Sequence, residues 1–145
     1  MADVPDEIHR RVQALCEQGD TLAKTGDYPA ALEQYWTAWD LLPEPQTEWK
    51  AATWILAAIG DANLLGGDYV AGRDNLSLAM RCPGAIGNPF LHFRLGQCQF
   101  ELGNLDRAAD ELARAYMGAG SKIFEGEDKY FAFLKSRIEP PPVGW

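Results

Sequence analysis

The sequence holds few of the side chains that bind metals or act as nucleophiles. Only two histidines, His9 and His92, occur in 145 residues, and neither belongs to a His-x-x-x-His or Glu-x-x-His pair. The Gly-x-Ser-x-Gly and Gly-x-x-x-x-Gly-Lys-Ser/Thr patterns are also absent, so neither a nucleophile elbow nor a phosphate loop is expected. Adjacent carboxylates such as Asp110 and Glu111 are typical of a solvated helix surface. The sequence therefore predicts no metal, no cofactor and no enzyme.

Cysteine is also scarce. The three thiols, Cys16, Cys82 and Cys98, are an odd number without Cys-x-x-Cys spacing, which does not match a disulfide framework. A cysteine within a periodic helical stretch is usually a small buried apolar side chain. We therefore expect all three to be structural.

No apolar run is long enough to cross a membrane. The most apolar stretch, residues 51–59, is far shorter than the about 20 apolar residues that a transmembrane helix needs. Acidic residues occur early, at Asp3, Asp6 and Glu7, and no long apolar region follows them, unlike in a secretory signal. These absences predict no membrane contact and a cytoplasmic location.

The sequence has fewer basic than acidic residues. Lys and Arg total 13 against 21 Asp and Glu, which gives a net charge of -8. Such a chain is repelled by nucleic acid phosphates and anionic lipids and is attracted to basic proteins. An acidic surface also serves solubility alone. The charge therefore predicts no nucleic acid partner and leaves a basic protein partner and simple solubility as alternatives.

A short glycine-containing phrase, in contrast, occurs three times in the sequence. Each copy is a glycine, an acid or amide, and a Tyr or Leu: Gly26-Asp27-Tyr28, Gly67-Asp68-Tyr69 and Gly103-Asn104-Leu105. A further glycine lies seven residues before each copy, at Gly19, Gly60 and Gly96. Small and large apolar residues recur after the copies: Ala31, Tyr35, Ala38, Leu76, Ala79, Ala108, Leu112 and Ala115. Glycine turns between such stretches predict pairs of helices.

The pattern resembles the tetratricopeptide repeat, a helix–turn–helix unit of about 34 residues. The resemblance covers about residues 12–120 and implies an all-α fold, a right-handed superhelical stack of about three units with a C-terminal capping helix. It implies repeats at about 12–45, 53–86 and 89–122 within a single domain, 1–145. The copies lie further apart than the family period, which predicts lengthened loops. The second repeat has Asn63 and Gly72 where a large aromatic residue and Ala are more typical.

Apolar spacing and capping residues place the individual helices. They are predicted at about 5–24, from the Gly26 turn to about 42, and at 46–66, 69–82, 89–102 and 105–118. A last amphipathic helix, over about 127–138, would cover the apolar face that a repeat stack leaves bare. Prolines at 140–142 end it, so residues 139–145 are predicted to be a Pro-rich tail.

The resemblance implies a concave groove lined by the first helix of each repeat. The positions it assigns to that groove are Gln13, Cys16, Asp20, Lys24, Trp54, Ala57, Asp61, Leu65, Phe90, Phe93, Gln97 and Glu101. Family members that grip a C-terminal carboxylate have Lys, Arg and Asn at several of these positions, so Asp20, Asp61 and Glu101 disfavour that ligand. The aromatic residues are typical of either a partner contact or a core. Trp49, beside the first long loop, is a second candidate.

These features favour a non-catalytic protein-binding module. Residues 81–90 and 124–134 are similar to a group of small bacterial tetratricopeptide-type proteins of polymorphic toxin systems. That similarity implies an immunity protein that occludes the active cleft of a basic toxin domain. Residues 93–103 are similar to three-repeat secretion chaperones, which hold a secreted segment in their groove. A generic scaffold is the third alternative, and the sequence leaves the partner and the oligomeric state open.

Overall fold

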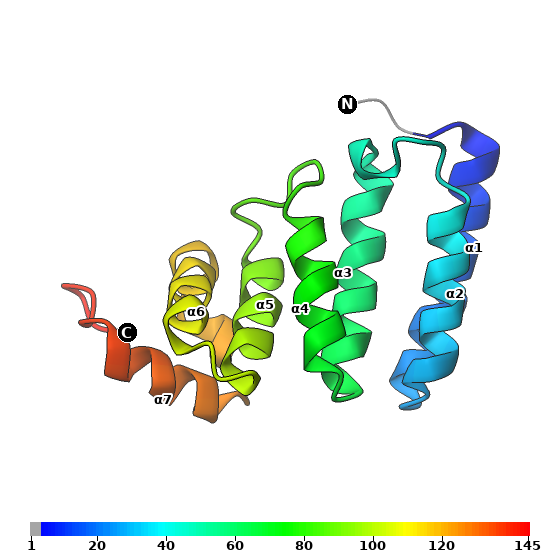
Figure 1. The fold of residues 1–145 in the computed structure, drawn as a ribbon. Helices are drawn as coiled ribbons and strands as arrows, with labels where there is room; N and C mark the ends of the chain where they lie inside the picture. Colours follow the sequence, from blue (N-terminus) through cyan, green and yellow to red (C-terminus); the bar gives the residue numbers. More distant parts are fainter. Residues whose placement is uncertain (1–3) are drawn as a thin grey trace. The chain divides into compact units, whose positions relative to one another are not determined.

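The computed structural model describes residues 4–145, and that range contains helices and loops without a β-strand (Figure 1). The helices in chain order are α1 (Asp6–Lys24), α2 (Tyr28–Asp40), the 3-10 helix η1 (Gln46–Glu48), α3 (Lys50–Leu65), α4 (Tyr69–Ala79), α5 (Pro89–Glu101), α6 (Leu105–Ala119), the 3-10 helix η2 (Gly120–Phe124) and α7 (Asp128–Arg137). The all-α prediction is confirmed. Residues 1–3, part of the segment that lacks a secretory pattern, lie outside the described residues.

The chain divides into two compact units. The N-terminal unit, residues 1–86, holds α1, α2, η1, α3 and α4. The C-terminal unit, residues 87–145, holds α5, α6, η2 and α7. A single domain over 1–145, with its three repeat ranges, stays a prediction.

The repeated phrase forms the turn between paired helices. Its glycines have φ of 83°, 84° and 81°, in the left-handed region that glycine adopts without strain: Gly26, Gly67 and Gly103. The acid that follows the glycine caps the next helix in the first two copies. Asp27 accepts a hydrogen bond from the Ala30 N–H at 3.2 Å, and Asp68 accepts one from the Ala71 N–H at 3.1 Å. The phrase therefore ends one helix and begins the next.

The glycines seven residues earlier let the paired helices approach closely. A Cβ at Gly60 would collide with the Leu76 side chain of α4, and a Cβ at Gly19 would collide with the Tyr35 ring of α2. Gly96 faces α6 in the same way. Because the interior is close-packed, any side chain at these positions would push the helices apart. The seven-residue spacing of the two glycines thus places the first at the helix crossing and the second in the turn.

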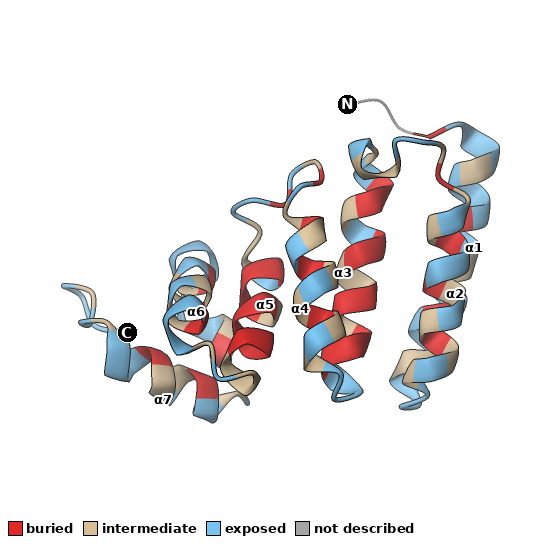
Figure 2. Cartoon of the chain, viewed as in Figure 1, coloured by how far each residue is buried: buried red, intermediate tan, exposed pale blue. Residues whose placement is uncertain are grey.

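Buried residues gather along α3 in the N-terminal unit (Figure 2). This helix contacts α1, α2 and α4, which explains why Ile55, Leu56 and Ile59 are fully buried. Burial of such side chains is the main favourable term in folding. Because α3 packs against three other helices, only the side chains that point away from all three remain exposed.

The core of the C-terminal unit is aromatic. The predicted last helix is present as α7 and packs on α6 and η2. Phe124 of η2 is 1% exposed and lies edge-on to Phe93, with ring centroids 5.1 Å apart. The predicted Pro-rich tail folds back on this unit, because the Trp145 ring lies 5.3 Å from Tyr116 and 5.7 Å from Phe131. The tail therefore contributes an aromatic side chain to the packing of the unit.

Candidate functional site

Four of the predicted groove residues line one cleft in the N-terminal unit. We call it the α1–α3 cleft; its volume is about 340 Å³ and its lining residues are Asp20, Ala23, Lys24, Tyr35, Asp61 and Leu65. The predicted members are Asp20, Lys24, Asp61 and Leu65. Each acid directly follows a helix-crossing glycine, Gly19 or Gly60, so both acids occupy the same register on their helices. Contact between α1 and α3 brings the two positions together.

A short hydrogen bond holds the acid of α1 in this cleft. Tyr35 Oη donates to Asp20 Oδ1 at 2.6 Å. Burial raises the pKa of Tyr35, and the hydrogen bond to Asp20 with the nearby charges raises it further. Burial also raises the pKa of Cys16 to about 12, and the charge of Asp20 adds to the effect. Neither group therefore adds negative charge beside Asp20 at neutral pH.

Exposed apolar side chains continue the same face along α3. Trp54 is 38% exposed and Leu65 is 49% exposed, although both are large apolar residues. Trp54 reaches α1 through an edge-to-face contact with His9, whose ring centroid is 6.4 Å away. Gln13 is exposed on α1. Aromatic residues at the surface beside polar ones are typical of protein contact surfaces.

Three of the four predicted groove residues of the C-terminal unit, Phe93, Gln97 and Glu101, contact the last segment of the chain. Phe93 is 4% exposed and Gln97 is 2% exposed. Gln97 Nε2 donates to Glu127 Oε2 at 3.3 Å, and Lys129 Nζ donates to Glu101 Oε1 at 2.7 Å. Phe93 and Gln97 therefore lie in the interior of this unit, while Glu101 takes part in an ion pair with α7.

The two remaining candidates, Phe90 and Trp49, differ in their surroundings. Phe90 is 40% exposed, and the Arg94 guanidinium lies over its ring at 5.3 Å from the centroid. Trp49 is half-buried, and its Nε1–H donates to the Pro43 carbonyl at 2.8 Å. This bond ties Trp49 to the start of the first long loop, so its indole has a role in the fold of that loop.

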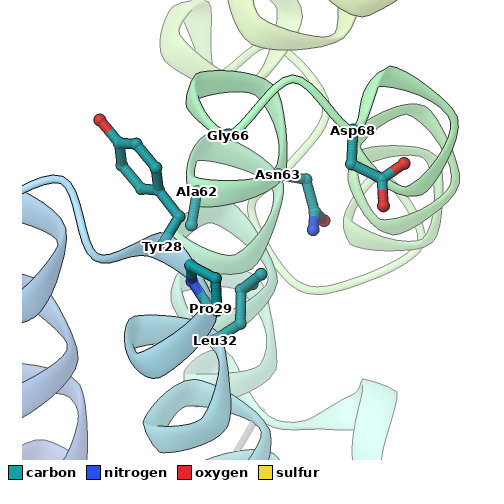
Figure 3. A pocket seen from close by; sticks show the side chains of 7 residues that line it. All are labelled: Tyr28, Pro29, Leu32, Ala62, Asn63, Gly66 and Asp68. Carbon is teal, nitrogen blue, oxygen red and sulfur yellow. The ribbon is translucent and has the colours of Figure 1, made fainter.

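Sequence reasoning missed a second cleft in the N-terminal unit, which Figure 3 shows. We call it the α2–α3 hollow; its volume is about 290 Å³ and its lining residues are Tyr28, Pro29, Leu32, Ala62, Asn63, Gly66 and Asp68. The groove prediction includes none of these residues. One signal was present, because Asn63 is smaller than the aromatic residue typical of its position in the repeat.

The histidines do not form a metal site with other side chains in the range 4–145. No three of the His, Cys, Asp and Glu residues described there come together as ligands would. The buried His92 uses both ring nitrogens, since Nδ1 lies 2.6 Å from Glu111 Oε2 and Nε2 accepts from the Gly87 N–H at 2.9 Å. Within the same range, the structure shows no helix with the length and apolar character needed to span a bilayer.

Comparison with known proteins finds similar structures without similar sequences. No protein-family model matches the sequence, and no curated protein matches it. The first TPR domain of Spaghetti (RPAP3), bound to the HSP90 peptide SRMEEVD, has a TM-score of 0.71 at 17% identity. That match covers 88% of this chain and 95% of the other.

Two further solved structures have nearly the same TM-score and sequence identity to this chain. The second TPR domain of human RPAP3, in complex with the HSP70 peptide SGPTIEEVD, has a TM-score of 0.69 at 18% identity, covering 89% of this chain and 96% of the other. The type III secretion chaperone SycD of Yersinia enterocolitica, in complex with a peptide of the translocator YopD, has a TM-score of 0.68 at 17% identity, covering 86% and 90%. At these identities the similarity concerns the fold, which is that of tetratricopeptide repeat domains.

Proposed function

We propose that this protein is a non-catalytic protein-binding module whose contact face runs along α1 and α3. The observation that carries the proposal is the α1–α3 cleft, where Asp20 and Asp61 lie beside the exposed Leu65. An acidic cleft next to exposed apolar side chains offers a partner both charge complementarity and apolar contact. Lys24, which lines the same cleft, adds a donor for polar groups of the partner.

The face has the length of a short extended segment. From Trp54 to Leu65 the α3 helix rises about 16 Å, at about 1.5 Å per residue. An extended chain rises about 3.3 Å per residue, so about five residues would span the same distance. The proposed ligand is therefore a short stretch of protein in contact with several turns of helix.

The charge of the cleft selects a basic partner. The RPAP3 domains used for comparison bind peptides that end in Glu-Glu-Val-Asp. Asp20 would repel such a carboxylate terminus, whereas Lys and Arg side chains would be attracted to it. The net charge of -8 adds a long-range attraction to basic proteins and opposes binding to nucleic acid or anionic lipid.

Within this class we favour a cytoplasmic immunity protein that neutralises a basic toxin domain by covering its active cleft. The acidic contact face and the similarity of residues 81–90 and 124–134 to proteins of polymorphic toxin systems support this role. A secretion chaperone is the second candidate, because the SycD structure was solved with a peptide of a translocator bound to the same fold. A chaperone would hold an unfolded segment along the same face.

Affinity purification from the native host, followed by mass spectrometry, separates these roles. One folded toxin domain in a stable complex supports the immunity role, and rescue of cells by co-expression would establish it. An unfolded secreted protein in the complex supports the chaperone. Several unrelated partners would contradict both and support a scaffold.

Asp20→Asn tests the contact face once a partner is purified. The amide keeps an acceptor for Tyr35 Oη but removes the charge, so association at low salt should slow about two- to fivefold and depend less on salt. Asp40→Asn is the matched control, because Asp40 is exposed on α2 and does not line the cleft. Binding kinetics at two salt concentrations measure both effects. Identical kinetics of Asp20→Asn and the parent would exclude the α1–α3 cleft as the contact face.

A further inference from the structure

The α2–α3 hollow shares no lining residue with the α1–α3 cleft. In Figure 3, Pro29 and Leu32 from the start of α2 lie beside Ala62 of α3. Asn63, near the end of α3, and Asp68, at the cap of α4, complete the other side. The hollow is therefore a second surface feature of the N-terminal unit, outside the proposed contact face.

Asn63 brings a hydrogen-bond donor to this hollow. The residue is 5% exposed, and its Oδ1 accepts from Asn75 Nδ2 at 2.9 Å. Within residues 4–145, no hydrogen bond of the structure engages Asn63 Nδ2. Nδ2 is not among the fully buried side-chain atoms that lack a partner in this range, so it stays within reach of solvent. A carbonyl acceptor placed in the hollow can take the place of water at this donor.

The walls of the hollow are apolar and hold their shape. Pro29 has a fixed φ, and Ala62 of α3 is buried. Gly66 leaves one side of the hollow open because it has no side chain. A Cβ at this position would lie 3.1 Å from the Ala62 carbonyl oxygen and 3.4 Å from Tyr28 Cβ. A site that exists before binding loses less conformational freedom when a ligand enters it.

Asp68 places a negative charge at the rim. Its Oδ1 accepts from the Ala71 N–H at 3.1 Å as the cap of α4, which holds the carboxylate in place. The residue is exposed, so a cation of a bound molecule can approach it from solvent. The hollow thus combines apolar walls, one amide donor and one carboxylate.

We propose that the α2–α3 hollow binds an apolar side chain of a partner protein. The main-chain carbonyl of that residue accepts from Asn63 Nδ2, and a neighbouring Lys or Arg pairs with Asp68. The volume of about 290 Å³ is at the lower limit of small-molecule sites, about 300–1,000 Å³, which suits one side chain with its peptide group better than a cofactor. The site is independent of the proposed contact face on α1 and α3.

Titration of the full ¹⁵N-labelled protein with acetyl-Leu-Lys-amide tests the site by NMR. We expect saturable shifts at Leu32, Asp68 and the Asn63 side-chain amide, with a dissociation constant on the order of millimolar. Acetyl-Gly-Lys-amide lacks the apolar side chain and should bind at least about tenfold more weakly. Acetyl-Leu-Glu-amide reverses the charge and should bind about threefold more weakly.

Two variants and a control complete the test. Asn63→Tyr fills the hollow and removes the donor, so the shifts should disappear in a variant that stays folded. If that variant does not fold, Leu32→Ala removes one half-exposed wall and should weaken binding about tenfold. Val70→Ala, exposed on α4 and outside the lining, should bind as the parent does. Equal affinity for the Leu and Gly probes, unchanged binding by a folded Asn63→Tyr or Leu32→Ala, or shifts confined to the α1–α3 cleft would each overturn the site.

Discussion

At the scale of single residues, the surroundings of Asp20 join side chains that sequence analysis treats separately. The repeat register predicts Asp20 at the groove, and helical spacing predicts Cys16 as a buried thiol; Cys16 is 7% exposed. In the sequence, Tyr35 is recognised only as one of the apolar residues that recur after the repeated phrase. The hydrogen bond from Tyr35 to Asp20 depends on how closely two helices pack, so a one-dimensional pattern does not contain it.

Two groups near Asp20, Cys16 and Tyr35, should make the protein less stable in alkali. The pKa of Cys16 is raised from 9.0 to about 12 and that of Tyr35 is raised above 10.0, mainly by burial. Both are neutral acids in the folded chain, so their contribution is fully present below pH 9 and is lost as the pH rises and the unfolded groups ionise. Above its unfolded pKa, 9.0 for Cys16 and 10.0 for Tyr35, and below its raised folded pKa, each group lowers the unfolding free energy by about 1.4 kcal/mol per pH unit.

Urea unfolding at several pH values between 8 and 11 measures this loss. The double variant Cys16→Ala, Tyr35→Phe should lose less stability over the same range. Cys82, whose pKa burial also raises, leaves part of the dependence in place. A parent midpoint that does not change with pH would contradict the prediction.

At the scale of helices, the sequence predicts bounds well where it contains caps. Helices predicted at 89–102 and 105–118 are found as α5 and α6, with Asn88 Oδ1 accepting from the Phe90 and Leu91 N–H groups. The helix predicted at 46–66 is divided into η1 and α3, because Trp49 between them is extended, with ψ of 144°. The side-chain bond of Trp49 to Pro43 accompanies this break, and spacing alone does not predict it.

Replacing a small residue at a helix crossing tests the register of the repeats. Ala31 and Ala108 are fully buried where α2 and α6 face their partner helices. Ala31→Leu or Ala108→Leu should cost about 1–3 kcal/mol of unfolding free energy, because the extra carbons overpack the crossing. Ala14→Leu, exposed on α1, is the matched control. Unchanged denaturant midpoints for both buried variants would refute the register.

At the scale of the whole molecule, the sequence predicts repeat positions but not which of them are covered by other parts of the chain. The register assigns Phe93 and Gln97 to the groove, yet both are buried by contacts that include η2 and α7. The aromatic residues of 124–134 do indicate a segment that needs a surface to pack on. Where it packs is decided by contacts distant in sequence, so the repeat register alone does not show that Phe93 and Gln97 are covered.

Removal of the chain from Lys129 onward should expose apolar surface in the C-terminal unit. Phe93 and Phe124 would lose the cover of Tyr130 and Leu134, which are among the buried residues of that core. Such a patch favours aggregation. Light scattering and thermal unfolding measure the effect, and a chain that ends after Glu139 should show a smaller one. A shortened protein that stays monomeric and equally stable would contradict the covering role of α7.

His92 offers a way to observe the start of the C-terminal unit in the intact protein. Because the Gly87 N–H donates to Nε2, the ring proton of the neutral imidazole resides on Nδ1 and is shared with Glu111 over 2.6 Å. A proton in so short a bond, on a side chain that is 3% exposed, should resonate far downfield and exchange slowly with water. The other imidazole, His9, is exposed on α1, so the resonance can be assigned without substitution. The resonance therefore reports whether the bond from the Gly87 N–H to His92 is kept when a partner is added.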